Sequence, residues 1–268
     1  MRFAVVATTA LFVVSCGTGN EGTIARVDLP ETDLDAVVTN VADGDSFRAE
    51  SPAGEIEVRL LGINSPELDE CHGPAARDAL ADLIEGHSIE LATEPELDQF
   101  DRVLARATVD GTYVNLDMVL NGHSLVVTEG STDREALLRA EGHARAGGIG
   151  LWASDVCGAE GPKASLEITG VDYDPPGADD DESVTIANTG VDPIDLAGFV
   201  LRDESSVNRF EFHDIILEPG SEIVIATGCG LRGEGIVAWC TDQPVWNNGG
   251  DTALVLDPLG RIVAIHRY

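Results

Sequence analysis

The stretch that decides the fold runs from Ala36 to Leu61 and reads AVVTNVADGDSFRAESPAGEIEVRLL. Apolar and polar residues alternate in three short runs, 36–41, 46–49 and 55–61, as they do on strands with one buried face. The segment Ser51-Pro52-Ala53-Gly54 supplies a turn between the last two runs. The sequence therefore predicts three consecutive strands at the start of a first domain, which we place at residues 35–157.

Downstream of these strands the pattern mixes helices with further strands. Gly73-Pro74 opens a helix whose apolar side chains share one face. Asn115 is expected to cap a short helix that ends at Leu120, and Asp110-Gly111 is a hairpin signal. Five strands with interspersed helices fit a β-barrel of the oligonucleotide-binding (OB) type. The remaining elements are expected at 88–92 and 103–109 (strands) and at 133–146 (a helix).

The second half of the chain has a different texture. Short strand candidates follow one another from Ser165 to Ile265, separated by turn signals and with little helical periodicity. This rhythm is typical of an antiparallel β-sandwich. The fold class predicted for the whole chain is therefore mainly β, with a helix-bearing barrel followed by a sandwich at residues 163–268.

Three polar motifs interrupt the barrel region: DGDS at 43–46, RLLGINSPE at 59–67 and DQFDR at 98–102. Carboxylates hold hard divalent cations, arginine forks bind phosphate oxygens, and a positioned carboxylate can deprotonate water. Together these are the parts needed to hydrolyse a phosphodiester bond. Each motif also has a simpler interpretation when taken alone. DGD is a common hairpin turn, Arg59 could pair across strands with Glu55 or Glu57, and Glu67 could be a solvated carboxylate.

In this order and spacing the motifs resemble those of the staphylococcal (thermonuclease-like) nuclease family. The resemblance implies a calcium-dependent enzyme, or one using another divalent cation, that cuts DNA or RNA to leave 3′-phosphate ends. It implies metal ligation by Asp45, Asn64 and the Ser65 carbonyl, with Asp43 behind them. Glu67 would be the general base, and Arg59 and Arg102 would bind the phosphate.

The chain departs from the family pattern at two places. Asn64 stands where the best-known pattern has an aspartate ligand, which predicts weaker metal binding or a changed metal preference. Phe100-Asp101 replaces the usual Tyr-Gly before Arg102, so Asp101 is expected to pair with Arg102 and partly neutralise it.

The second domain also carries a resemblance. The pieces 184–190, 194–199, LEPG at 217–220 and WNNGGD at 246–251 are similar to the lamin-tail domain, an immunoglobulin-like sandwich. The resemblance names no partner for this sandwich. Asp179-Asp180-Asp181-Glu182 is expected to be a solvated loop, with a calcium site as the alternative.

The amino terminus predicts export. A basic start is followed by an apolar run at 4–14, too short to span a bilayer, which is typical of a cleaved signal. Val13-Val14-Ser15-Cys16 resembles the lipobox of bacterial lipoproteins, in which Cys16 would be lipidated. Residues 1–16 are then signal and lipidation site, and 17–34 a tether. The expected location is the outer face of a bacterial membrane, or the medium if the signal is an ordinary secretory one.

The other cysteines fit an exported chain. Cys71, Cys157, Cys229 and Cys240 are even in number, and disulfides are expected in an oxidising compartment. We expect Cys71 to pair with Cys157 and Cys229 with Cys240. A zinc site is the alternative, but neither paired C-x-x-C motifs nor spaced histidines favour it. The six histidines are scattered and are expected to face solvent.

Charge argues against tight binding to a polynucleotide. The net charge is −32, and residues 35–157 alone hold 24 Asp and Glu against 8 Arg. Phosphate contacts dominate nucleic-acid affinity, and binding proteins usually show a basic surface. The rival hypothesis is therefore a non-catalytic cell-surface binding module with a degenerate nuclease barrel. A third hypothesis is a calcium-dependent structural role for the Asp-rich second domain.

Overall fold

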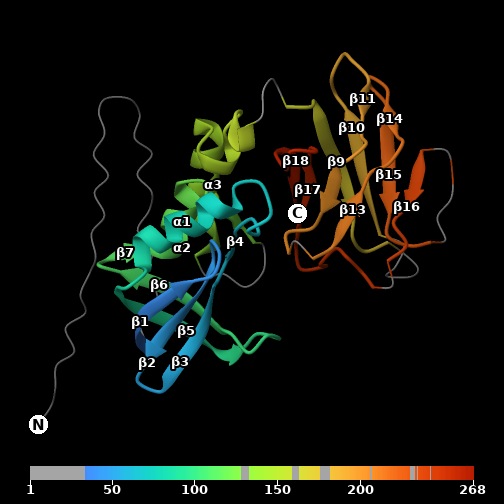
Figure 1. The fold of residues 1–268 in the computed structure, drawn as a ribbon. Helices are drawn as coiled ribbons and strands as arrows, with labels where there is room; N and C mark the ends of the chain where they lie inside the picture. The colour runs from blue at the N-terminus through green and yellow to red at the C-terminus, as the bar shows by residue number, and fades with distance from the viewer. Residues whose placement is uncertain are drawn as a thin grey trace, which may run out of the picture.

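The computed structural model describes residues 34–127, 133–158, 163–175, 182–205, 207–229, 233, 235–241 and 243–268. Two β-rich bodies lie side by side, and the helices all belong to the first of them (Figure 1). The predicted signal, the lipidation site at Cys16 and the tether fall outside the described residues, except that Leu34 already begins the first strand. No helix in the described part of the chain has the length and apolar character required to cross a membrane.

The first body is a closed barrel, which confirms the predicted fold class. Its strands are hydrogen-bonded in the order β3-β2-β1-β5-β6, and a parallel pairing of β3 with β6 closes the ring. That closing pairing joins Val58 to Val103, Arg59 to Leu104 and Leu60 to Ala105. The strands are β1 (Leu34–Val41), β2 (Ser46–Ser51), β3 (Gly54–Leu60), β5 (Ser88–Leu97) and β6 (Val103–Val109).

The barrel interior explains why the alternating pattern was informative. Phe47, Val58 and Leu60 are essentially inaccessible to solvent, whereas Arg48 and Glu57 beside them in the sequence are exposed. Each large side chain buried in this way contributes about 1.5 to 3 kcal/mol to stability. Strand β5 runs five residues beyond its predicted end at Ala92, so β5 and β6 form a hairpin that extends past the barrel.

Three helices cover one side of the barrel. They are α1 (Gly73–Ile84), α2 (Val114–Leu120) and α3 (Arg134–Gly147). The prediction that Asn115 caps α2 is wrong, because Tyr113 occupies the cap position and Asn115 lies inside the helix. The Asn115 side chain instead accepts from the Ala107 amide at 3.0 Å and donates to the Leu61 carbonyl at 2.9 Å. It therefore ties α2 to the barrel strands. Short pieces complete this body: β4 (Ile63–Asn64), β7 (Thr112–Tyr113), β8 (Leu125–Val126), η1 (Gly150–Trp152) and η2 (Val156–Gly158).

The second body is a sandwich of two four-stranded sheets. One has the order β16-β15-β10-β9 and the other β13-β12-β17-β18. Buried aliphatic and aromatic side chains from both sheets, Phe212 and Trp246 among them, fill the space between the sheets. The strands are β9 (Leu166–Asp172), β10 (Ser183–Asn188), β11 (Ile194–Asp195), β12 (Val200–Arg202), β13 (Arg209–Glu211), β14 (Ile216–Leu217), β15 (Glu222–Ala226), β16 (Ile236–Ala238), β17 (Thr252–Leu256) and β18 (Ile262–Arg267).

The acidic run near residue 180 is only partly within the described residues. Residues 179–181 lie outside them, but Glu182 lies within and is buried rather than solvated. Its carboxylate accepts from the main-chain amides of Val245 and Trp246 at 2.8 and 3.3 Å. The expectation of a solvated residue is therefore wrong for Glu182, because its charge satisfies buried amides.

Both expected disulfides are present. Cys71 and Cys157 are joined across 86 residues of sequence, with their Cα atoms 5.7 Å apart. Cys229 and Cys240 are joined across 11 residues. In the chain-entropy model, a bridge closing a loop as long as the first stabilises the folded state by about 4 to 5 kcal/mol.

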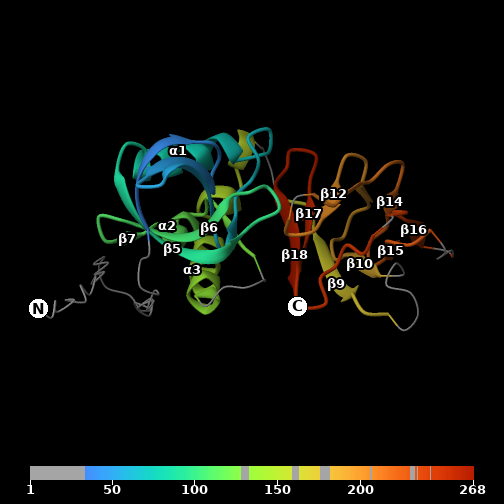
Figure 2. The same ribbon diagram turned by 90° about the horizontal axis from the view of Figure 1, so that it is seen from below.

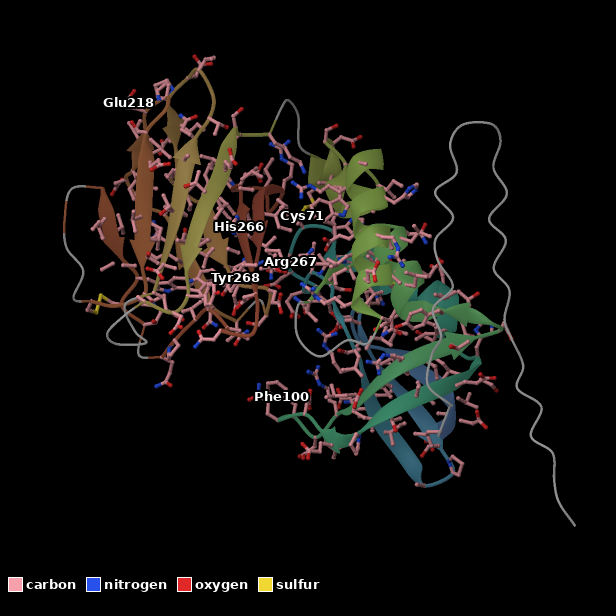
Figure 3. The ribbon with its side chains drawn as sticks, turned by 180° about the vertical axis from the view of Figure 1, so that it is seen from behind. Cys71, Phe100, Glu218, His266, Arg267 and Tyr268 are labelled. Carbon is pink, nitrogen blue, oxygen red and sulfur yellow. A yellow bond between two sulfur atoms is a disulfide. The ribbon has the colours of Figure 1, made fainter. Side chains whose placement is uncertain are left out.

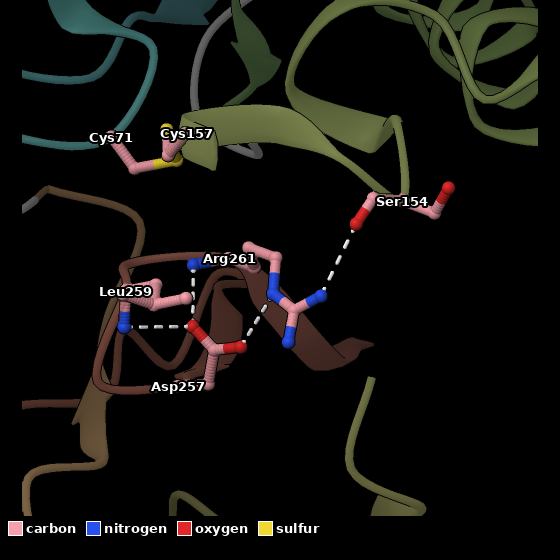
Figure 4. Close-up of a disulfide and its surroundings, with 6 residues drawn as sticks. All are labelled: Cys71, Ser154, Cys157, Asp257, Leu259 and Arg261. Carbon is pink, nitrogen blue, oxygen red and sulfur yellow. Dashed lines mark hydrogen bonds and ion pairs between the residues drawn. A yellow bond between two sulfur atoms is a disulfide. The ribbon is translucent and has the colours of Figure 1, made fainter. Parts of the chain in front are cut away.

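The two bodies are packed against each other. A shared apolar cluster joins Leu125, Leu151 and Trp152 of the first body to Leu254 of the second. Figures 2 and 3 show β17 and β18 at this junction, with Arg267 directed toward the first body. Figure 4 shows Arg261 donating to the Ser154 carbonyl, at 3.1 Å, beside the Cys71–Cys157 bridge. The sandwich is therefore docked on the barrel through apolar and polar contacts.

Candidate active site

The candidate site lies where three connections meet at one end of the barrel. Asp45 ends the turn between β1 and β2, and its side chain is buried, with 5% of the residue exposed. One carboxylate oxygen, Oδ1, accepts from Ser46 Oγ at 3.1 Å and forms an ion pair with Arg59 Nη1 at 3.1 Å. The other, Oδ2, accepts from the Ser65 amide at 2.5 Å. Asp45 therefore joins β2, β3 and the loop after β4.

Burial raises the pKa of Asp45 to about 7, against the opposing effect of the Arg59 guanidinium, and the nearby Asp43 carboxylate raises it further. Asp43 Oδ1 accepts from the Asp45 amide at 3.0 Å, which holds the turn in shape. A negative charge at Asp45 is thus costly in this environment unless more positive charge is brought to it.

Gly44 permits the close approach of these segments. A Cβ atom at this position would lie 2.6 Å from Ser65 Cβ and 2.7 Å from Ala76 Cβ. No side chain fits in that space, so only glycine lets the turn pack against the loop and against α1. The DGDS motif is therefore more than a hairpin turn, because its glycine fixes the distance between two segments of the site.

The Arg59 side chain turns inward, toward the loop that follows its own strand. Nη1 donates to the Leu60 and Ile63 carbonyls at 3.0 and 2.9 Å, and Nη2 donates to Asn64 Oδ1 at 2.8 Å. Its ion pair is with Asp45, so the cross-strand pairing with Glu55 or Glu57 is not the arrangement found. Five donors on a planar fork suit such a junction.

Arg102 reaches the same region from the start of β6. Its Nε pairs with Asp98 Oδ2 at 2.8 Å, and its Nη1 lies 3.4 Å from Ser46 Oγ. The prediction that Asp101 would hold Arg102 is wrong, because Asp98, four residues earlier, makes that ion pair. Asp101 adopts a left-handed backbone conformation, with φ of 63°, as a glycine would. Arg59 and Arg102 thus both contact the Asp45–Ser46 pair.

Phe100 marks the outer end of the hairpin that carries Arg102. It is 65% exposed, and Figure 3 shows it projecting from the β5–β6 hairpin. The Arg102 guanidinium carbon lies 5.2 Å from the centre of the ring. An exposed ring beside a guanidinium offers a stacking face to an aromatic base.

Glu67 lies on the exposed side of the loop between β4 and α1. Partial burial and the charges of Asp43 and Glu70 raise its pKa, whereas Arg59 lowers it. Its main-chain amide donates to Glu70 Oε2 at 2.9 Å. Glu67 therefore interacts electrostatically with Asp43 and with Arg59, the arginine that pairs with Asp45.

The fit of a divalent cation can be judged from the donor chemistry. Within the described ranges no three His, Cys, Asp or Glu side chains are grouped as a metal site. The available donors are the Asp43 and Asp45 carboxylates, the Asn64 amide oxygen and the Ser65 carbonyl, all hard oxygen ligands. A cation there would also stabilise the ionised form of Asp45, whose pKa is raised by burial and, to a smaller extent, by the Asp43 carboxylate. The residues therefore suit Ca²⁺ or a similar hard ion.

Sequence reasoning missed several neighbours of the site. Ser124 Oγ lies 2.6 Å from Ser65 Oγ, and both serines are buried. Asn64 Nδ2 donates to the main-chain carbonyl of Glu204, 140 residues away in the sandwich, at 2.9 Å. Arg209 of the sandwich forms an ion pair with Glu70. In the sequence, only Cys71, next to the loop that carries Glu67, indicated that distant parts of the chain converge at this site.

Two histidines also contradict the prediction of solvent exposure. The rings of His72 and His123 are stacked, with centroids 5.2 Å apart, and His72 Nε2 lies 3.0 Å from His123 Nδ1. Burial, with a smaller effect from His123, lowers the pKa of His72 to about 4. Burial also lowers the pKa of His123, although Asp117 opposes this change. The pair joins the loop before α1 to the turn after α2.

Comparisons with known proteins agree with this geometry. Residues 57–154 match the family model of the staphylococcal nuclease homologues, and residues 159–268 match that of the lamin tail domain. Strands β1 and β2 precede the first matched segment but belong to the same closed barrel.

Individual relatives carry nuclease names. An uncharacterized endonuclease of Haemophilus influenzae is 32% identical over 119 residues, which are 44% of this chain and 66% of that protein. A probable staphylococcal-like nuclease of rice is 34% identical over 102 residues, which are 38% of this chain and 27% of that protein. An uncharacterized endonuclease of Escherichia coli is 29% identical over 122 residues, covering 45% of this chain and 78% of that protein. Each alignment thus covers less than half of this chain.

Proposed function

We propose that this chain, which carries a staphylococcal nuclease domain followed by a lamin tail domain, is a metal-dependent endonuclease acting outside the cytoplasm. The observation that carries the proposal is the meeting of Asp45, Arg59 and Arg102 at one end of the barrel, beside Glu67. The substrate class is DNA or RNA, and the products carry 3′-phosphate ends. Lipid attachment at Cys16 would keep the enzyme at the outer face of a bacterial membrane.

The proposed chemistry gives each side chain a separate task, and the choice of the 5′-oxygen as the leaving group comes from the family resemblance. The Glu67 carboxylate takes a proton from a water molecule, whose oxygen forms a bond to phosphorus. The bond from phosphorus to the 5′-oxygen breaks, and that oxygen is protonated by solvent. The raised pKa of Glu67 brings its basicity closer to neutral pH, where a general base is most effective.

The two arginines have a different task. Arg59 and Arg102 place positive charge where the phosphoryl oxygens become more negative in the transition state. Asp45, Asn64 and the Ser65 carbonyl, with Asp43 behind them, would hold Ca²⁺. When bound, such an ion supplies further positive charge for the same oxygens.

The rival function, a binding module without catalysis, has one observation in its favour. Arg59 already donates to the Leu60 and Ile63 carbonyls and to Asn64, as well as pairing with Asp45. A phosphate would have to share these donors or replace one of their acceptors. The acidic composition also opposes substrate attraction at long range.

One experiment separates the two functions. The chain from residue 17 onward is incubated with single-stranded DNA and, separately, RNA, in Ca²⁺ or in chelator, and the cut ends are analysed. We expect Ca²⁺-dependent cutting that Glu67→Gln lowers by about 10²-fold or more, the scale of a lost general base. Glu57→Gln, an exposed carboxylate on β3, is the matched control and should cut normally. If no cutting is seen with any of several divalent metals and salt levels, the binding module is the better description.

A further inference from the structure

Four arginines of the sandwich interact with the barrel. Arg261 donates to the Ser154 carbonyl, and Arg267 pairs with Glu141 at 2.8 Å. Arg209 pairs with Glu70, and the buried Arg202 interacts electrostatically with Glu70 and Glu67. In an acidic domain, this distribution makes the barrel-facing side electrostatically distinct from the rest of the domain. The basic residues from 158 onward are Lys163, Arg202, Arg209, Arg232, Arg261 and Arg267, of which residue 232 is outside the described ranges.

One series of contacts runs from the sandwich to the candidate base. Arg209, at the start of β13, forms its ion pair with Glu70 Oε1. The other oxygen of the same carboxylate, Oε2, accepts from the Glu67 main-chain amide at 2.9 Å. The charges of Arg202 and Arg209 and the Glu67 amide together lower the pKa of Glu70, despite its partial burial. Glu70 is thereby kept ionised, as the contact requires.

A second series of contacts reaches a candidate metal ligand. The Glu204 carbonyl accepts from Asn64 Nδ2 at 2.9 Å, in a buried position. Asn64 Oδ1 accepts at the same time from Arg59 Nη2 at 2.8 Å. An amide can donate on one side and accept on the other, whereas an ionised carboxylate can only accept. This explains why an asparagine suits position 64 in a chain whose sandwich presents a carbonyl to that position.

The far end of the same loop is also enclosed. Cys71 follows Glu70 directly and is bridged to Cys157. Gly260, in the turn between β17 and β18, packs so closely that a Cβ there would lie 2.7 Å from Cys71 Cβ. Residues 64–71 are therefore bounded by the sandwich near Asn64, Glu70 and Cys71.

From these contacts we infer that the sandwich holds the catalytic loop of the barrel in its working shape. Arg209 is a positioning residue that fixes Glu67 through Glu70, and the Glu204 main chain supports Asn64. The inference rests on the proposed function for its effect on catalysis, but its structural part can be tested without any activity. A misplacement of about 1 Å at a reacting group costs up to about 10²-fold in rate.

The kinetic test uses Arg209→Ala in the chain from residue 17 onward, with single-stranded DNA and Ca²⁺. We expect kcat to fall about 10-fold while KM changes less than 3-fold, because the group being placed acts in the transition state. Arg209→Lys, which keeps the charge facing Glu70, should recover part of the loss. The matched control is Arg139→Ala, which removes an exposed ion pair with Glu135 on α3. The Arg139 side chain is about as exposed as that of Arg209.

The structural test follows amide hydrogen exchange in the peptide that spans residues 64–71. Exchange should become at least 3-fold faster in Arg209→Ala and stay unchanged in Arg139→Ala. Unchanged exchange in Arg209→Ala overturns the inference. The inference is also overturned if the wild-type chain is active and Arg209→Ala keeps the wild-type kcat although its loop exchanges faster. If the wild-type chain cuts nothing while exchange responds as expected, the sandwich does hold the loop in place but the proposed function fails.

Discussion

The two domains each contain a buried aspartate paired with an arginine, and the two pairs differ in what surrounds them. Asp45 and Asp257 are equally buried, at 5% exposed. Asp257 pairs with Arg261 four residues later, at 2.6 Å, and also accepts from the Leu259 and Arg261 amides. Asp45 pairs with an arginine from another strand and has a second carboxylate, Asp43, beside it.

Under the proposed function, this difference separates a structural ion pair from one that belongs to the active site. The Asp257–Arg261 ion pair lies within one turn and its charges are matched locally, although Arg261 also donates to the Ser154 carbonyl of the barrel. The Asp45–Arg59 pair joins several segments and leaves Asp45 with a pKa raised to about 7. Strongly perturbed carboxylates that sit beside a specific charged partner are typical of functional sites. Exchanging each aspartate for asparagine therefore tests the comparison directly.

The largest effect is expected from Asp45→Asn. The rate of phosphodiester cleavage should fall by about 10²- to 10³-fold, equivalent to roughly 3 to 4 kcal/mol of activation free energy, because an anionic ligand is lost. The free energy of unfolding should change by less than about 1 kcal/mol, since a neutral group replaces a carboxylate that burial already disfavours. Initial rates and urea denaturation are the measurements. A stable variant with normal activity would remove Asp45 from the site.

Asp257→Asn should reverse that pattern. Breaking a buried ion pair leaves Arg261 uncompensated and should lower the free energy of unfolding by about 3 kcal/mol. Cleavage measured well below the melting temperature should remain within about 2-fold of wild type. The two aspartates would cease to be a useful contrast if this variant lost activity while keeping its stability.

Asn64→Asp sharpens the comparison at the interface between the domains. The new carboxylate cannot donate to the Glu204 carbonyl, so the free energy of unfolding should fall by about 1 to 2 kcal/mol. Thermal denaturation measures this change, with Asn40→Asp, at an exposed position of β1, as the control. Equal stability of the Asn64 variant and wild type would mean that the carbonyl contact contributes little.

The smallest effect concerns the histidine pair. The pKa of His72 in the folded chain, about 4, lies below its ordinary value of 6.5, so the folded state binds fewer protons between these pH values. Stability should therefore fall as the pH decreases from about 6.5 toward 4, by about 1 kcal/mol for this partly exposed ring after allowance for screening. His72→Gln should flatten that part of the stability profile, whereas His87→Gln, on an exposed turn, should not. An identical slope in both variants would show that the histidine pair does not govern this range.

The sequence predicted the barrel because its strands follow a strict alternation with local turn signals. Asp45, Arg59 and Arg102 were chosen from three polar motifs and from the resemblance to the nuclease family, and each lies at the end or the start of such a strand. The partners of Asn64 were not predictable, because one of them is a main-chain carbonyl 140 residues away. Every residue carries a main-chain carbonyl, so the residue type at a position does not show which side chain that carbonyl will contact.

The errors have a common physical origin as well. Asn115 has the residue type of a helix cap but ties its helix to Leu61 and to Ala107 of β6. Asp101 was expected to pair with Arg102 because it is adjacent, whereas Asp98 forms that pair. The His72–His123 pair depends on two loops meeting in space. In each case the three-dimensional path of the chain outweighed the local preference of the residue.

The parallel seam between β3 and β6 has a consequence for how the molecule would lose its chemistry on heating. It holds only three residue pairs, against six between β2 and β3, and parallel ladders are slightly weaker per residue. Arg59 lies within the seam and Arg102 immediately precedes it. Any fluctuation that unzips this edge therefore pulls the two guanidinium groups apart before the remaining strands separate, so thermal inactivation should precede global melting.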